Sequence, residues 1–164
     1  MRLLQLVAVA AVVAAIGAVA APAPAATAVP VNLHVVESLK APPLTFPTCP
    51  DIGLDVNCGT GEFLPFGRVH SIVSIGVCGD TCSIRWITAA QGTIVLREIA
   101  SDFSCPGACA TEWPHGGSFY ATVTATVVDG DGIFEGATGS LTGTLKAVAL
   151  QAQITYSGEI ALAG

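Results

Sequence analysis

Of the charged side chains that fall within segments alternating like β-strands, four could do chemistry if they face the interior. They are Glu37, Arg85, Arg97 and Glu98. A lone charge facing a protein interior is very costly, so any inward member must be paired or hydrogen-bonded. An inward glutamate whose pKa is raised by desolvation would be a candidate acid or base. The alternative, which is commoner for charges on strands, is an outward side chain in solvent.

A second group of acids lies among glycines, at Asp129, Asp131 and Glu135. Their spacing does not match the calcium loop of an EF-hand, which is longer and needs ligands at positions 1, 3, 5 and 12. Asp-Gly pairs are instead typical of hairpin turns. The three histidines also lack the H-x-H and H-x-x-x-H spacings of metal sites. We therefore expect no metal and no cofactor.

Six cysteines form the strongest covalent signal. An even number of cysteines in a small exported chain predicts three disulfides, although fifteen connectivities are possible. Local pairs are the simplest, because Gly-Asp-Thr and Pro-Gly-Ala can each form a turn between two cysteines. A zinc site built from the two C-x-x-x-C pairs is the less favoured alternative. The expected pairs are Cys49 with Cys58, Cys78 with Cys82, and Cys105 with Cys109.

Four aromatic or imidazole side chains are candidate ligand contacts. Trp113 and His115 lie in a long loop, 101–117, and loops of that length often carry function. The alternative is that they only anchor the loop. Trp86 and Tyr156 could stack on a ligand, or they could be core aromatics whose polar tips are satisfied.

The elements that must position these residues are strands. Residues 118–128 alternate most regularly, with Phe119 and Val123 on one face and Tyr120 and Thr122 on the other. Short strands at regular spacing, with no helical periodicity after residue 28, predict an all-β barrel or sandwich, and closure into a barrel removes exposed edges. We predict a single eight-stranded antiparallel β-barrel over 29–164, stapled by disulfides. Seven of these strands are expected at 31–37, 68–77, 83–90, 93–100, 118–128, 141–149 and 153–162, with a Pro/Cys-rich loop at 38–60.

A glycine-rich stretch, 129–143, separates two of these strands. It predicts a turn, a buried Phe134 and a second turn that together close the barrel. No Walker-type motif accompanies it, so the glycines are structural and do not bind phosphate. The structural glycines are Gly130, Gly132, Gly136 and Gly139.

The N-terminus predicts export. Arg2 precedes an apolar run, and small residues around 23–28 fit signal peptidase, so residues 1–28 are predicted to be a cleaved signal peptide. An uncleaved membrane anchor is the alternative. The chain has 164 residues with a formal net charge of −6 and no run of Lys or Arg. We therefore expect a secreted protein without a stable membrane anchor that binds neither nucleic acid nor anionic membranes.

The glycine stretch also carries a resemblance. Residues 130–139, G-D-G-I-F-E-G-A-T-G, resemble the G-x-G-[IV]-F-E-G-x-x-G signature of allene oxide cyclases, and more loosely the corresponding motif of dirigent proteins. Three further segments are similar in matching order: 33–37, 61–66 and 154–160. The chain also resembles small exported bacterial proteins with this barrel, which mostly have no assigned activity.

The resemblance implies an eight-stranded barrel with an apolar cavity. In the cyclases the cavity shapes an unsaturated fatty epoxide for ring closure without a cofactor, and dirigent proteins steer the coupling of phenoxy radicals. Pro65 corresponds to a proline that lines the cyclase cavity. The cyclases also use a glutamate near the first strand, for which Glu37 is the candidate.

These observations favour a non-catalytic exported barrel that binds a small apolar ligand or an extracellular partner. One alternative is a cofactor-free isomerase or cyclase that confines a lipid-like substrate. A further alternative is a structural or inhibitory domain with a filled interior.

Overall fold

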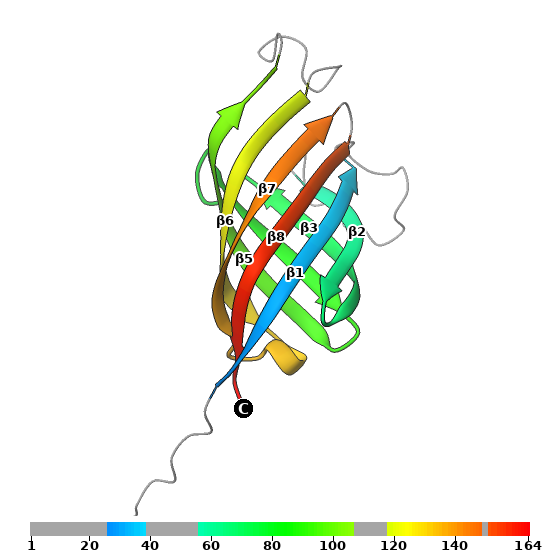
Figure 1. Ribbon diagram of the computed structural model, residues 1–164, viewed down its shortest axis with the longest axis vertical. Coiled ribbons are helices and arrows are strands. Elements are labelled where there is room, and N and C mark those ends of the chain that lie inside the picture. The colour runs from blue at the N-terminus through cyan, green and yellow to red at the C-terminus, as the bar shows by residue number, and fades with distance from the viewer. Residues whose placement is uncertain (1–25, 39–55, 107–117, 149–150) are drawn as a thin grey trace, which may run out of the picture.

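The computed structural model describes residues 26–38, 56–106, 118–148 and 151–164. They form a closed barrel in which each strand pairs antiparallel with the next and β8 pairs with β1 (Figure 1). The predicted all-β, eight-stranded antiparallel barrel is therefore confirmed. The strands are β1 (Thr27–Ser38), β2 (Val56–Leu64), β3 (Gly67–Ile75), β4 (Cys82–Ala89), β5 (Gly92–Ser104), β6 (Ser118–Gly130), β7 (Thr138–Val148) and β8 (Gln151–Leu162).

Alternation along the strands determines which side chains fill the barrel. In β6, Ala121, Val123 and Ala125 are buried, whereas Thr122 and Thr124 between them are exposed. A strand presents successive side chains to opposite faces, so the apolar set lines the interior. The same phase continues in β8, where Ile154 and Tyr156 point inward.

One end of the barrel, here called the Phe end, is packed by three aromatic rings. Phe63 and Phe134 are fully buried, and the ring centroid of Phe66 lies 4.8 Å from that of Phe134 and 5.0 Å from that of Phe63. Phe134 ends the short 3-10 helix η1 (Gly132–Phe134), which connects β6 to β7 and is visible at the bottom of Figure 1. The prediction of a buried Phe134 is confirmed.

The glycines around Phe134 allow close backbone approach. A Cβ atom on Gly130 would lie 2.4 Å from the carbonyl oxygen of Phe134, and Gly132 has a φ of +60°. Asp131 accepts a hydrogen bond from the Thr93 amide at 2.6 Å, so this acid is structural. The stretch does not close the barrel by itself, because closure comes from the pairing of β1 with β8.

The described part of each of two predicted loops is largely strand. β2 begins at Val56, so residues 56–60 of the predicted 38–60 loop belong to a strand. β5 continues to Ser104, which removes 101–104 from the predicted 101–117 loop. The predicted second strand, 68–77, in turn ends at Ile75. β1 begins at Thr27 and so includes the last two residues of the segment predicted as leader, most of which lies outside the described residues.

One predicted disulfide is present. Cys78 and Cys82 are bonded between β3 and β4, with their Cα atoms 5.1 Å apart, so this pair is not a zinc ligand. Cys58 and Cys105 are also disulfide-bonded. Their predicted partners, Cys49 and Cys109, lie outside the described residues. Among the described residues no helix is both long and apolar enough to cross a membrane.

Candidate functional site: a buried charge cluster beside a cavity

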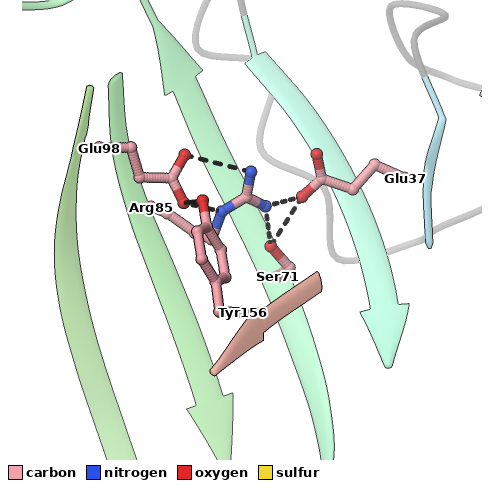
Figure 2. A network of polar contacts seen from close by, with 5 residues as sticks. All are labelled: Glu37, Ser71, Arg85, Glu98 and Tyr156. Atoms are coloured by element: carbon pink, nitrogen blue, oxygen red, sulfur yellow. Dashed lines mark hydrogen bonds and ion pairs between the residues drawn. The ribbon is translucent and has the colours of Figure 1, made fainter. Parts of the chain in front are cut away.

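Five polar side chains from five strands meet inside the barrel (Figure 2). We call them the charge cluster. They face inward because each is in phase with buried apolar residues of its strand, as Arg85 is with Ile87 and as Glu98 is with Leu96. The members are Glu37 on β1, Ser71 on β3, Arg85 on β4, Glu98 on β5 and Tyr156 on β8.

Arg85 is the centre of the cluster. Its Nε donates to Oε1 of Glu98, and its Nη2 donates to Oε2 of the same carboxylate at 3.3 Å. Its Nη1 donates to Oε1 of Glu37 and, at 2.7 Å, to the Ser71 hydroxyl. The Ser71 hydroxyl donates to the same Glu37 oxygen at 2.8 Å. One guanidinium therefore joins two carboxylates that approach it from opposite sides.

The electrostatics explain why these charges tolerate burial. Arg85, Glu37 and Glu98 are each no more than 5% exposed. Burial alone would lower the pKa of Arg85, but the charges of Glu37 and Glu98 outweigh it and raise this pKa well above its usual value. The guanidinium is thus permanently charged. With both glutamates ionised, the cluster carries a net charge of −1.

Tyr156 completes the cluster from the side of the Phe end. It is fully buried, and its hydroxyl donates to Oε1 of Glu98 at 2.5 Å. Burial, followed by the negative charge of Glu98, raises the pKa of Tyr156 well above its usual value. Tyr156 is therefore a neutral hydrogen-bond donor near neutral pH.

Glycines on neighbouring strands leave room for the larger members. A Cβ atom on Gly59 would lie 2.7 Å from Cγ of Glu37, and one on Gly143 would lie 2.6 Å from Cδ1 of Tyr156. Real Cβ atoms do not approach other heavy atoms so closely, so neither position accepts a side chain without rearrangement. The glycines of β2 and β7 are therefore part of the construction of the site.

A cavity of about 230 Å³ lies on the other side of the cluster, toward the end where β1 ends and β2 begins. We call this the cavity end. Glu37, Asn57, Arg85 and Glu98 supply its charged and amide groups, and exposed Ile75, Asp80 and Phe103 mark its mouth. Its remaining walls are mostly apolar and include Val73, Val123, Leu145, Ala147, Ala152 and Ile154.

Several polar atoms that line the cavity remain unused. The hydrogen bonds that Glu37 accepts from the described residues both go to Oε1, and in Figure 2 no dashed line reaches its other carboxylate oxygen. Asn57 is 8% exposed, and its side-chain amide likewise has no hydrogen-bond partner there. Fully enclosed polar atoms of the described residues all have partners, so these two groups are reached from the cavity. The arrangement can therefore bind a polar group that enters from the cavity end.

The structure brings together only part of the predicted site. Glu37 is inward and lines the cavity, and Tyr156 contacts the same cluster through Glu98. Pro65 was expected to line the cavity, but it is exposed in the turn between β2 and β3, at the opposite end of the barrel from Glu37. Trp86 faces outward, because Arg85 and Ile87 on either side of it face inward. Trp113 and His115 lie outside the described residues.

Sequence reasoning did not assign Ser71 or Asn57 to a site, and it favoured outward positions for Arg85 and Glu98. The alternation of β5 could have predicted that Glu98 faces inward, because Glu98 lies on the same face of the strand as the buried Ile94 and Leu96. Of the four strand charges considered, only Arg97 is exposed. Within the described part of the chain, no group of three or more His, Cys, Asp or Glu residues is arranged to hold a metal ion.

Comparison with models of known protein families, with curated proteins and with solved structures finds no match. The resemblance of residues 130–139 to allene oxide cyclases and dirigent proteins thus stays a prediction from the sequence. The geometry of the cavity and the charge cluster is therefore the evidence on function.

Proposed function

We propose that this protein is an exported barrel that binds a small, largely apolar ligand in the cavity at the cavity end, without altering it chemically. The observation that carries the proposal is the cavity itself, which has apolar walls and a few converging polar groups held by the charge cluster. That combination is typical of small-molecule sites. The Cys78–Cys82 disulfide is compatible with the oxidising environment that export would provide.

The volume limits the size of the ligand. An apolar cavity of about 150 Å³ accommodates benzene. The cavity of about 230 Å³ therefore suits one ring with a short substituent, or an aliphatic molecule of similar bulk. A long fatty chain would have to extend past the mouth.

A cofactor-free isomerase or cyclase is the second candidate. Glu37 favours it, because this carboxylate lines the cavity and has an uncommitted oxygen. Pro65 does not favour it, because Pro65 is exposed at the other end of the barrel. The two functions differ in product: a ligand recovered from the protein after prolonged incubation is unchanged under our proposal, and mass-neutral rearrangement detected by chromatography would favour the isomerase. The cavity makes a purely structural domain with a filled interior the weakest candidate.

Occlusion of the cavity tests the proposal. Ala147 is buried and lines the cavity, so Ala147→Phe should fill it and weaken binding of a neutral probe, 2-phenylethanol, at least about tenfold as the probe loses its apolar contacts. The neighbouring Val148 is 42% exposed and does not line the cavity, so Val148→Phe is the matched control. Titration followed by ¹H–¹⁵N NMR gives both affinities. Equal affinities for the two variants would contradict the proposal.

A further inference from the structure

We infer that the ligand of this cavity is an amine, recognised as a cation by Glu37 and Asn57. The inference rests on the proposed function, since it names the chemical class that the same cavity would select. Three observations carry it: the charge balance of the cluster, the unused polar atoms and the carboxylate of Asp80 at the mouth.

The charge balance favours a cation. Arg85 is the only Lys or Arg that lines the cavity among the described residues, and it already pairs with both Glu37 and Glu98. The two carboxylates exceed the one guanidinium by a single negative charge. Asp80 adds another carboxylate at the mouth. A cationic group entering the cavity would balance the cluster, whereas an anion would add to its excess charge.

The unused atoms match an ammonium group. Oε2 of Glu37 and the Asn57 side-chain oxygen are acceptors reached from the cavity, and both side chains are more than nine-tenths buried. Gly59 of β2 pairs with Glu37, and Asn57 lies two residues from Gly59 on the same inward face, so the two acceptors come from adjacent strands. An ammonium group has three donors, so it has enough to donate to both acceptors.

Arg85 has one unused donor, which would favour a hydrogen-bond acceptor on the ligand instead of a cation. Four of its five N–H donors are used within the cluster, and one hydrogen on Nη2 is left. That hydrogen suits a neutral oxygen, such as a hydroxyl, beside the ammonium. A ligand carboxylate beside Nη2 would lie close to the carboxylates of Glu37 and Glu98. Like charges that are close together in a partly buried site repel strongly.

The walls define the rest of the ligand. They are apolar and include Leu145 and Ile154, and Phe119 lies near the mouth in contact with Phe103, with ring centroids 5.4 Å apart. An arylalkylamine with one ring, or an aliphatic amine of similar bulk, fills this space. A lysine side chain of a peptide shares the ammonium group but has only four methylenes to cover the walls.

Three probes of nearly equal shape test the inference on the intact, oxidised chain: 2-phenylethylamine, 2-phenylethanol and phenylacetate, with Nα-acetyl-lysine methylamide as a fourth arm. We expect 2-phenylethylamine to bind at least about tenfold more tightly than 2-phenylethanol, and phenylacetate more weakly than both. Nα-acetyl-lysine methylamide should bind more weakly than 2-phenylethylamine. Isothermal titration calorimetry at neutral pH measures all four.

Two variants test whether Glu37 and Asn57 cause the preference for the amine over the alcohol. Glu37→Gln should remove the preference for the amine over the alcohol, and Glu62→Gln, which changes an exposed carboxylate of β2, should keep it. Asn57→Leu leaves the ion pairs of the cluster intact and should weaken the amine more than the alcohol. It therefore tests the inference even if Glu37→Gln does not fold.

The outcomes separate the two proposals. If 2-phenylethanol binds and the amine binds no better, the inference is wrong and the proposed function stands. The inference is also wrong if the amine preference is unchanged in Glu37→Gln, or unchanged in Asn57→Leu where Glu37→Gln does not fold, or if the lysine derivative binds best. If none of the four probes binds, both the inference and the proposed function are contradicted.

Discussion

At the scale of single residues, the charge cluster is the least expected part of the molecule. The sequence reveals Glu37, Arg85 and Glu98 as strand charges, but each is more often outward when judged alone. Their partners lie on other strands, and only the closed register brings them together. Buried ions persist only when paired, so the pairing could not be predicted before the topology was known.

Arg85 should be essential to stability. Arg85→Met leaves Glu37 and Glu98 buried without their cation, which should cost about 3–5 kcal/mol of unfolding free energy. Arg97 is exposed on the next strand, so Arg97→Met should change stability by less than about 0.5 kcal/mol. Urea unfolding measures both. If Arg85→Met changed the free energy of unfolding as little as Arg97→Met, the ion pairs of Arg85 would not be needed for stability.

Tyr156 should make stability sensitive to alkaline pH. Its pKa is raised in the folded protein by burial and by Glu98, above the value of about 10 for an unfolded tyrosine. Its contribution is therefore fully present below pH 10 and is lost as pH rises from there toward the folded pKa, at up to about 1.4 kcal/mol per pH unit. Tyr156→Phe should lack this loss.

The comparison is made by urea unfolding of both proteins at pH 9 and pH 11. Tyr156→Phe should be the less stable at pH 9, by about 1–3 kcal/mol, because the Glu98 carboxylate loses a buried donor. The difference between the two proteins should shrink at pH 11. A constant difference across this range would contradict the role assigned to Tyr156.

At the scale of elements, alternation predicted most strands and missed β2. This strand contains Gly59 and Gly61 at inward positions, and glycine has low strand propensity, so the segment looks like a loop. The same glycines are required there, because a Cβ atom on Gly61 would lie 1.9 Å from the carbonyl oxygen of His34. The glycines that this close backbone approach requires therefore lower the strand propensity of β2, and propensity alone does not predict the strand.

The connection between β6 and β7 gives a prediction at this scale. Phe134 is fully buried against Phe63 and Phe66, so Phe134→Ala should cost about 3–5 kcal/mol. Ile133 beside it is 41% exposed, and Ile133→Ala should cost far less. Binding of 2-phenylethanol should be unchanged in folded Phe134→Ala, because the Phe end is remote from the cavity. Lost binding with unchanged stability would show that Phe134 belongs to the ligand site.

At the scale of the whole molecule, the barrel divides into two ends with the charge cluster between them. Phe63, Phe66 and Phe134 and much of the apolar core fill the Phe end, and the cavity occupies the other end. The number and antiparallel order of the strands could be predicted from regular spacing. The division could not, because it depends on which inward positions face one another across the interior. Pro65 is an example: a local sequence motif predicted that it lines the cavity, but in the fold it lies at the Phe end.

The central claim is that a small ligand enters the cavity beside the charge cluster, and the most direct test is where a bound probe lies. Intermolecular nuclear Overhauser effects between 2-phenylethanol and methyl groups of the protein locate it. We expect contacts to Val73, Leu145 and Ile154 and none to Leu141 or Ile160, which belong to the core outside the cavity lining. Contacts confined to the Phe end or the outer surface, or no contacts at saturating probe, would contradict it.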